Sequence, residues 1–231
     1  MTDTRQDLDQ VHDYYCVPRP AGADDRTIYQ IWEDGGAFND SVTPSTYNPE
    51  YRDYMARKIL SLAPAGARVF SFGCGNGFVE GDLVSAGLDV RAIDCNEEAV
   101  ALTRRKGVDA FAADYYALEP ADVAGTDIIY ADGFLGHLFD ADEELRPVLG
   151  KLADLQPRSG ATLVFSNDAP GDGRAAFASH PAVEGFWFIS KGHLSKSLAA
   201  VGFEPLESYY FPYSRPVSGV RYRTICTARV P

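Results

Sequence analysis

The sequence has little sulfur, little tryptophan and no long apolar run. Its 231 residues include 4 cysteines, 2 methionines and 2 tryptophans. No apolar stretch approaches the roughly 18 to 20 residues that a membrane helix needs. Hydrophobic residues make up 45% and charged residues 23%, which is typical of an ordinary globular protein. These values exclude a disordered tail, a collagen-like rod and a coiled coil. They predict one domain with a small appendage.

Positive charge is also scarce. The chain has 21 Lys and Arg against 33 Asp and Glu, a formal net charge of −12, and no basic run compensates for the excess of acid. Such a surface repels phosphate backbones, so we expect no nucleic-acid partner. An acidic surface would suit a cationic small molecule, although the charge could equally serve only to keep the protein soluble.

The four cysteines form no recognisable framework. Cys16, Cys74, Cys95 and Cys226 include no C-x-x-C pair, and no histidine stands at metal-ligand spacing from any of them. We therefore expect free thiols, with neither a disulfide framework nor a zinc site. The first residues, MTDTRQDLDQVHDYY, are polar and acidic, unlike a signal peptide. We expect a cytoplasmic protein that does not associate with membranes, and the oligomeric state stays open.

Strand and helix signals alternate through the middle of the chain. Short apolar runs predict strands at 68–72, 88–93, 108–112, 126–131 and 160–165. Helical spacing predicts helices at 7–15, 50–62, 79–86, 97–106 and 142–155. Such alternation implies right-handed parallel crossovers and a doubly wound α/β sheet.

The C-terminal part has a different pattern. Two strand-like runs, 203–211 and 220–230, follow one another with no helix between them. In the second run Arg221 and Arg223 alternate with Val220 and Tyr222, a period of two that predicts a sheet edge with one wetter face. The pair is expected to form an antiparallel hairpin that closes a mostly parallel sheet.

A glycine-rich loop follows the first of the alternating strands. Residues 68–72 run into Gly73-Cys74-Gly75-Asn76-Gly77, and a helix begins immediately afterwards. Glycine lets the main chain turn sharply and lets a ligand approach the backbone. The next strand ends at Asp94, 21 residues after Gly73, where a carboxylate can accept hydrogen bonds from both hydroxyls of a ribose. The placement predicts a nucleoside site beyond the carboxyl ends of the strands.

The loop lacks two known nucleotide-binding motifs, and their absence limits which nucleoside it is expected to bind. The dinucleotide fingerprint G-x-G-x-x-G/A needs Gly or Ala at position 78, where Phe78 stands. A phosphate-binding P-loop needs G-K-[ST], which is absent. A nicotinamide-dependent oxidoreductase therefore remains an alternative that Phe78 disfavours.

Four segments resemble motifs of the class I S-adenosylmethionine-dependent methyltransferases. They are VFSFGCGNG at 69–77, AID at 92–94, ADY at 113–115 and DIIYADGFLGHL at 127–138. The resemblance covers residues 66–166 and implies a Rossmann-like, doubly wound, seven-stranded sheet that is mostly parallel, with an antiparallel C-terminal hairpin. It also implies S-adenosyl-L-methionine as cofactor and S-adenosyl-L-homocysteine as product.

The same resemblance assigns the cofactor contacts. Asp94 would hold the ribose and Asp114 the adenine amino group, while Cys95 and Tyr115 would pack against adenine. The full set of expected cofactor residues is Gly73, Cys74, Gly75, Gly77, Asp94, Cys95, Asp114, Tyr115, Ala131 and Asp132. One position departs from the family pattern. The acid that usually precedes the first motif glycine by two residues, and helps to orient the glycine loop and the methionine ammonium group, is here Ser71.

Catalytic and substrate-binding candidates come from residues near these motifs. His137 follows the fourth strand, where the family often presents a residue to the transferable methyl group, so it is the candidate base, with Tyr15 as a second catalytic candidate. Aromatic faces attract a sulfonium or ammonium group. The expected substrate-binding residues are Tyr14, Tyr29, Trp32, Phe134, Trp187 and His193. His12 and His180 are expected at the surface.

Taken together, the patterns predict two regions. Residues 1–60 would form an N-terminal helical lid, and residues 61–231 a cofactor-binding core with a substrate-covering insertion near 168–190. Asp132, Asn167 and Asp168 have oxygen atoms that suit Mg²⁺, but we interpret them as polar residues at the substrate mouth and predict no metal.

The predicted function is methyl transfer to nitrogen or oxygen of a small molecule, such as a natural product or an amine metabolite. Alternatives are a non-catalytic scaffold with the same fold, because fold does not fix function, and another use of the same cofactor.

Overall fold

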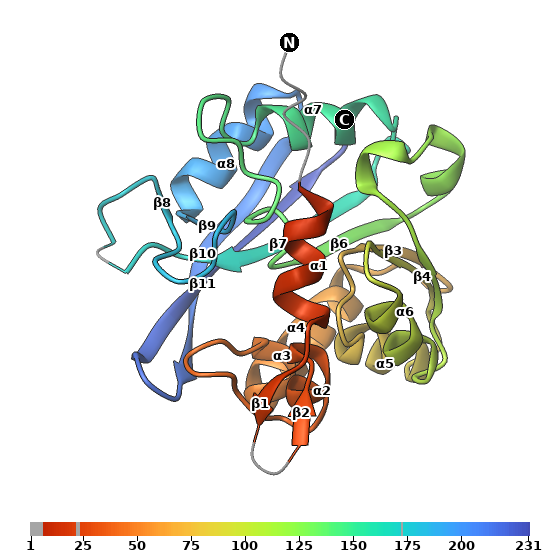
Figure 1. Cartoon of the computed structure of the whole chain (residues 1–231). Helices are drawn as coiled ribbons and strands as arrows, with labels where there is room; N and C mark the ends of the chain where they lie inside the picture. The colour runs from red at the N-terminus through yellow and green to blue at the C-terminus, as the bar shows by residue number, and fades with distance from the viewer. Residues whose placement is uncertain (1–6, 22–23, 172) are drawn as a thin grey trace.

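A computed structural model describes residues 7–21, 24–171 and 173–231, and its centre is one seven-stranded sheet (Figure 1). The strand order is β10-β11-β7-β6-β3-β4-β5. The five parallel strands are β3 (Arg68–Phe72), β4 (Asp89–Asp94), β5 (Asp109–Ala112), β6 (Ile128–Asp132) and β7 (Thr162–Asp168). The antiparallel pair is β10 (Glu204–Arg215) and β11 (Gly219–Arg229). The predicted Rossmann-like, doubly wound fold is confirmed.

Helices cover both faces of this sheet. One face packs against α4 (Pro49–Leu62), α5 (Phe78–Ser85) and α6 (Glu97–Arg104), and the other against α7 (Arg146–Asp154) and α8 (Lys191–Ala200). Strand β3 explains how both cores form. Val69 lies in one apolar cluster, whereas Phe70 and Phe72 lie in the other. Because alternate side chains of a strand point to opposite faces, a continuous apolar run fits a strand that is buried on both sides.

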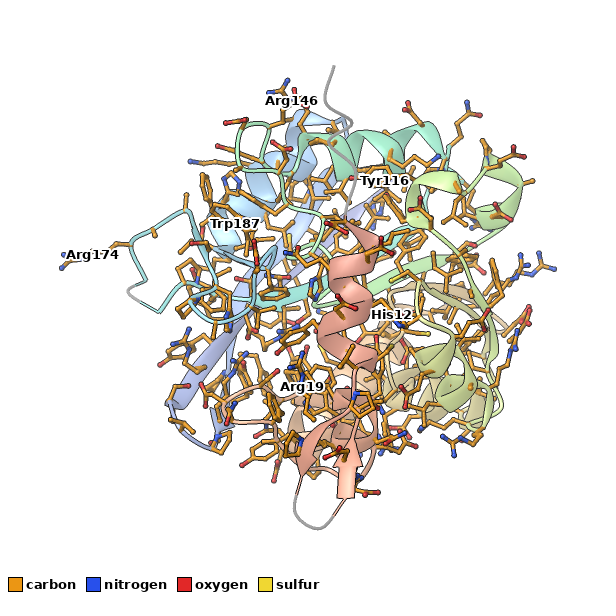
Figure 2. All side chains as sticks on the ribbon, viewed as in Figure 1. His12, Arg19, Tyr116, Arg146, Arg174 and Trp187 are labelled. Atoms are coloured by element: carbon orange, nitrogen blue, oxygen red, sulfur yellow. The ribbon has the colours of Figure 1, made fainter. Side chains whose placement is uncertain are left out.

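The N-terminal region adds short elements beside the carboxyl ends of the parallel strands. They are α1 (Leu8–Cys16), the pair β1 (Arg19–Ala21) and β2 (Asp24–Arg26), α2 (Ile28–Glu33) and α3 (Pro44–Tyr47). Helix α2 starts at a capping box in which Thr27 and Gln30 satisfy each other's backbone N–H groups. The polar His12 of α1 is exposed, as expected (Figure 2). Helix α4 packs within the core through Tyr51, Met55 and Ile59.

Two expectations about the sheet need correction. Strand β11 is not at an edge, because β10 lies outside it. The expected wetter face of this strand is also wrong, since Arg223 is only 2% exposed and the stretch from Arg223 to Ala228 is buried. The hairpin continues beyond the end of β7, whose last residue, Asp168, pairs with Arg223, and it reaches the pair of Arg215 with Gly219 (Figure 1).

Helix α7 starts at Arg146, four residues later than the sequence pattern indicates. The Asp140 carboxylate accepts hydrogen bonds from the backbone N–H groups of Asp142 and Glu143, at 2.8 and 2.6 Å. Glu144 then has φ of 59°, in the left-handed region. A side chain that satisfies these N–H groups competes with the helix, so the first turn is lost.

The insertion after β7 contains a small antiparallel pair, β8 (Phe177–Ser179) and β9 (Trp187–Ile189). Between β5 and β6 the chain makes two 3₁₀ turns, Tyr115–Ala117 and Pro120–Val123. No helix of the described residues has both the length and the apolar character to cross a membrane.

Candidate active site

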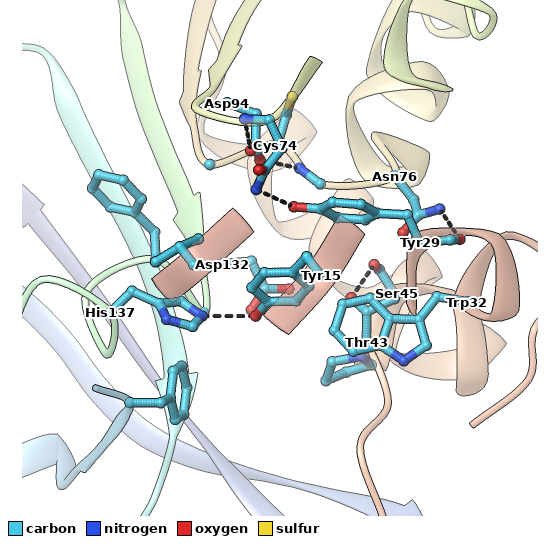
Figure 3. A pocket seen from close by; sticks show the side chains of 18 of the residues that line it. Tyr15, Tyr29, Trp32, Thr43, Ser45, Cys74, Asn76, Asp94, Asp132 and His137 are labelled. Atoms are coloured by element: carbon cyan, nitrogen blue, oxygen red, sulfur yellow. Dashed lines mark hydrogen bonds between the residues drawn. The ribbon is translucent and has the colours of Figure 1, made fainter. Parts of the chain in front are cut away.

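A deep cavity opens at the carboxyl ends of the parallel strands (Figure 3). Its floor comes from the glycine loop after β3 and from the ends of β4, β6 and β7. Its cover comes from α1, α2 and the insertion, and residues of β10 and β11 close the far side. The cavity therefore lies where open α/β sheets bind their ligands.

The glycine loop is shaped by close packing as well as by its turns. Gly73, Gly75 and Gly77 have φ between +53° and +68°, where other residues are strained. A Cβ atom on Gly77 would lie 2.4 Å from Oγ1 of Thr103, and one on Gly73 would lie 2.7 Å from the ring of Phe134. A Cβ atom on Gly75 would meet only Tyr29 of α2, at 4.0 Å. Gly75 is thus the glycine whose surface is left open toward the cavity.

Asp94 ends β4 at the edge of this loop. Its carboxylate accepts hydrogen bonds from the backbone N–H groups of Gly75 and Asn96, both at 3.0 Å (Figure 3). Burial raises the pKa of the Asp94 carboxyl, and the two backbone donors oppose that shift. A carboxylate offers about four lone-pair directions. Asp94 can therefore hold the loop in place and still accept hydrogen bonds from a ligand in the cavity, which it lines.

The expected cofactor residues divide into two groups. Gly73, Cys74, Gly75, Asp94, Cys95, Tyr115 and Asp132 line the cavity, whereas Gly77, Asp114 and Ala131 lie outside its lining. The Asp114 carboxylate accepts a hydrogen bond from the backbone N–H of Tyr116 at 2.9 Å. The hydroxyl of Tyr115 donates to the backbone carbonyl of Val148, which fixes the ring at the cavity wall.

His137 and Tyr15 meet in the middle of the cavity. The Tyr15 hydroxyl and Nε2 of His137 share a hydrogen bond of 2.7 Å (Figure 3). Burial, with a smaller effect from the charge of His180, lowers the pKa of His137 to about 4. Burial also raises the pKa of Tyr15 well above its usual range. Both side chains are therefore neutral at physiological pH.

Three further aromatic side chains of α1 and α2 line the cavity around this pair, namely Tyr14, Tyr29 and Trp32. The rings of Tyr15 and Tyr29 stack with centroids 5.1 Å apart. Tyr29 is fixed to the floor, because Nδ2 of Asn96 donates to its hydroxyl at 3.1 Å and Nδ2 of Asn76 donates to its carbonyl at 3.0 Å. The cover is thus held by the glycine loop and by the residues that follow β4.

Three further substrate candidates lie in different places. Phe134 lines the cavity and stacks on Phe72. Trp187 lies outside the lining, and its ring stacks on that of Phe139 with centroids 4.8 Å apart. His193 also lies outside it, with Nε2 3.3 Å from the Glu144 carboxylate.

A buried network of two arginines and two aspartates closes the far side, and it was not anticipated from the sequence. The Arg223 guanidinium pairs with Asp132 and, at 3.2 Å, with Asp168, while Arg215 pairs with Asp168 at 2.5 Å. Tyr51 donates to Asp132 at 3.1 Å. Burial alone would raise the pKa of Asp168, but the two guanidinium groups lower it to about 2. Isolated buried charges are very costly, so mutual pairing is what permits them here.

His180 was also misplaced by the sequence-based expectation. It was expected at the surface, but it is half-buried and lines the cavity. Its Nδ1 accepts hydrogen bonds from the backbone N–H groups of Ala182 and Val183, at 3.0 and 2.9 Å. Nε2 therefore carries the proton of the neutral ring. No spacing signal in the sequence marks this residue, because a turn of the insertion brings it to the site.

Glu80 is a further cavity residue that the sequence-based expectations did not include. It lies in the first turn of α5, lines the cavity and is only 4% exposed. The Ser71 hydroxyl donates to its Oε1 at 2.6 Å. Burial raises the pKa of Glu80 to about 7, against the opposing effect of the Ser71 hydrogen bond. The sequence signal for Glu80 is the departure from the family pattern at Ser71, together with an acid in the first turn of the following helix.

The part of the chain that the structure describes contains no group of three or more His, Cys, Asp and Glu side chains that could hold a metal ion. Asn167, which was considered with Asp132 and Asp168 as an oxygen ligand, is buried. Its Oδ1 accepts a hydrogen bond from the backbone N–H of Gly136 at 2.9 Å. The four cysteines are free thiols.

Comparisons with known proteins agree with this architecture. No model of a known protein family matches the chain. Among solved structures it resembles the 1,6-didemethyltoxoflavin N1-methyltransferase of Burkholderia thailandensis bound to its substrate and S-adenosylhomocysteine, with 23% identity and a TM-score of 0.58. The match covers 78% of this chain and 76% of the other.

Two further structures resemble the chain over a larger part of their own length. A glycopeptide N-methyltransferase with bound S-adenosylmethionine is 15% identical, with a TM-score of 0.59 and coverage of 77% and 93%. The magnesium protoporphyrin IX methyltransferase of Synechocystis PCC 6803, also with S-adenosylmethionine, is 16% identical, with a TM-score of 0.59 and coverage of 88% and 90%. The predicted cofactor agrees with the ligands of these structures.

A much nearer relative is the protein described as tabtoxin biosynthesis enzyme from Pseudomonas amygdali pv. tabaci. It is 59% identical over 231 residues, which is 100% of this chain and 92% of the relative. The chain therefore belongs to the same family as the tabtoxin biosynthesis enzyme, and it has the class I S-adenosylmethionine-dependent methyltransferase fold.

Proposed function

We propose that the protein transfers a methyl group from S-adenosylmethionine to a nitrogen or oxygen atom of a small molecule. The observation that supports this most directly is one continuous cavity that connects Asp94 and the glycine loop with His137 and then with Arg215 and His180. Transfer between two substrates needs a site for the cofactor nucleoside, a site for the acceptor and polar groups between them, and the cavity has polar residues at both ends and in the middle.

The residues at the nucleoside end fit this cofactor. Asp94 has acceptor capacity left for the ribose hydroxyls, and the open surface of Gly75 allows a ligand to approach the backbone. Cys95 and Tyr115 lie at the cavity wall where adenine would pack. When bound, S-adenosylmethionine supplies a methyl group on a positively charged sulfur, and the aromatic rings of the cover suit a cation.

The protein's own contribution is then alignment and exclusion of water. His137 is neutral because burial lowers its pKa to about 4, so a ring nitrogen can accept a hydrogen bond from an N–H or O–H group of the acceptor. An imidazole with so low a pKa is a weak base, and its main role is to orient the nucleophile. Good alignment alone can lower a barrier by roughly 7 to 11 kcal/mol. The Tyr15 hydroxyl marks the place where the acceptor group would bond to His137.

The acceptor would bind at the far end, between the insertion and the β10–β11 hairpin. Arg215 and His180 present N–H groups there, and Phe186 contacts the ring of His137 with centroids 4.7 Å apart. The family relative is named for the biosynthesis of tabtoxin, which supports an acceptor from natural-product metabolism.

Transfer of label tests this proposal. The purified protein is incubated with methyl-labelled S-adenosylmethionine and a metabolite extract of its source organism. Label is expected in a low-molecular-weight product, together with one equivalent of S-adenosylhomocysteine. Transfer to protein or RNA would contradict the substrate class. Tight binding of S-adenosylhomocysteine without transfer to any acceptor would favour the non-catalytic alternative.

A further inference from the structure

Ser71 stands where the methyltransferase family usually has an acid, and Glu80 approaches the same place from α5. The Ser71 hydroxyl donates to Oε1 of Glu80 at 2.6 Å, and the two side chains are 1% and 4% exposed. Glu80 also lines the cavity beside the glycine loop. The strand end at Ser71 therefore retains a carboxylate beside it, although the carboxylate comes from another element.

In the described parts of the chain, no group of opposite charge contacts the Glu80 carboxylate directly. Among the described residues it takes part in no ion pair. The neighbouring Lys106 pairs with Glu33 at 2.6 Å, and the neighbouring Asp132 pairs with Arg223. Cys74 and Tyr130 also lie close, and burial raises the pKa of both well above their usual ranges, so they are neutral near pH 7. Burying a carboxyl group without a cation is costly.

A ligand cation would remove that cost. By the family resemblance, the main chain at Gly73 contacts the methionine part of the cofactor, and that part ends in an α-ammonium group. We propose that Glu80, oriented by Ser71, is the carboxylate that faces the α-ammonium group of the cofactor, an inference that rests on the proposed function. The carboxylate that the family pattern places on strand β3 would come in this protein from helix α5.

The relocated acid makes cofactor affinity depend on pH. In the free protein burial raises the pKa of Glu80 to about 7, so at lower pH the group is mostly protonated and uncharged. An ammonium ligand favours the charged form, so binding below pH 7 must first release a proton. Affinity is therefore highest above pH 7 and falls as the pH drops through 7. If only the charged form binds, the dissociation constant rises roughly tenfold between pH 8 and pH 6.

The test compares two ligands by calorimetry between pH 6 and pH 8. S-adenosylhomocysteine carries the ammonium group, whereas 5′-methylthioadenosine has the same adenosine and sulfur without it. S-adenosylhomocysteine is expected to bind about tenfold more weakly at pH 6 than at pH 8. The affinity of 5′-methylthioadenosine should not change. A titration of Asp94 would alter both ligands equally, because both carry the ribose.

Variants assign the effect to the residue. Glu80→Gln keeps the shape and a hydrogen bond to Ser71, and it should lower S-adenosylhomocysteine affinity at pH 8 by about tenfold and remove its pH dependence. The double variant Ser71→Asp with Glu80→Gln returns the acid to the strand and should restore affinity. Asp82→Asn, on the same helix and paired with Arg52, is the matched control and should keep the wild-type response.

Each outcome decides a different point. An equal pH response of both ligands in the wild type, or an unchanged response in Glu80→Gln, overturns the role of Glu80 while the proposed function stands. Failure of both ligands to bind at any pH overturns the proposed function and this role with it. If Glu80→Gln does not fold, as judged by circular dichroism, the two-ligand comparison on the wild type still decides.

Discussion

The hydroxyl of Tyr15 and Nε2 of His137 lie 2.7 Å apart, although 122 positions separate them in the chain. The first belongs to the helix that covers the cavity and the second to the loop after β6. This hydrogen bond therefore joins the helical cover directly to the candidate catalytic histidine. Under the proposed function, an acceptor that bonds to Nε2 of His137 would take over the hydrogen bond that Tyr15 makes.

Replacing His137 should impair turnover more than cofactor binding. We expect His137→Gln to lower kcat/KM for the acceptor by about 100-fold, because the nucleophile loses its orienting partner. Its affinity for S-adenosylhomocysteine should stay near the wild-type value. Tyr15→Phe, which keeps the stacked ring, should have a smaller effect on kcat/KM. Steady-state kinetics at saturating S-adenosylmethionine, with calorimetry alongside, would measure both.

The pH profile of the wild type provides a second check on His137. Under the proposed function the neutral ring is the form that orients the acceptor, and with a pKa of about 4 it predominates above pH 5. At saturating cofactor the rate should therefore show no acidic limb from His137 between pH 6 and pH 9. A limb near pH 6.5 that disappears in His137→Gln would mean that this histidine titrates in its ordinary range.

Asp94 should matter for both adenosine ligands. Removing a carboxylate that hydrogen-bonds the ribose costs about 1.5 to 3 kcal/mol, which corresponds to a loss of roughly 10- to 100-fold in affinity. We expect Asp94→Ala to weaken S-adenosylhomocysteine and 5′-methylthioadenosine alike. Asp89→Ala changes an exposed acid at the other end of β4 and is the control. Equal ligand affinities of the wild type and Asp94→Ala would show that the ribose does not bind at Asp94.

A substitution at Gly77 measures how much of the need for glycine comes from a collision of the added Cβ atom with its neighbours. Gly77 and Gly87 both have positive φ, at 68° and 90°, but only at Gly77 would a Cβ atom collide with Thr103. Around Gly87 nothing lies within 4 Å. Gly87→Ala should cost about 1 to 2 kcal/mol of unfolding free energy, from the left-handed backbone alone. Gly77→Ala should cost about 1 to 3 kcal/mol more. Urea unfolding measures both, and equal losses would contradict the predicted collision.

Arg223 should be a large contributor to stability. Its removal leaves Asp132 and Asp168 buried without their shared cation, so Arg223→Met is expected to lower the unfolding free energy by about 3 to 5 kcal/mol. Arg57→Met removes the exposed pair with Asp53 and should cost less than about 1 kcal/mol. Similar losses in the two variants would mean that the buried network is no stronger than a surface ion pair.

The same network predicts a loss of stability in acid. The pKa of Asp168 is about 2 in the folded protein, below its value of about 3.9 in an unfolded chain. A lowered pKa means that the stabilisation is present above pH 4 and is lost as the pH falls through 2. Urea unfolding between pH 2 and pH 5 should show this loss in the wild type. Asp168→Asn should lack this part of the pH dependence.

The sequence was sufficient for the parallel strands, the glycine loop and Asp94, because each depends on neighbours within about twenty residues. The Ser71–Glu80 pair is equally local, because its two residues are nine positions apart, but no motif of the sequence marks Glu80. The arginine network depends on distant parts of the chain. Arg223 and Asp132 are 91 positions apart, and they meet only because β11 pairs with β7 and β7 with β6 in one particular register. An alternating pattern reveals which residues share a face of a strand. It does not reveal whether other elements bury that face, and for this reason Arg223 was expected to be solvated.

The β10–β11 hairpin is at once a border of the sheet and a wall of the cavity, since it continues past β7 and carries Arg215 to the cavity. Adding or deleting one residue inside β10 would turn Tyr213 and Arg215 to the opposite side of the strand. If the proposed function holds, acceptor choice is therefore open to change through the length of β10 alone, while the residues that line the cofactor end of the cavity stay the same.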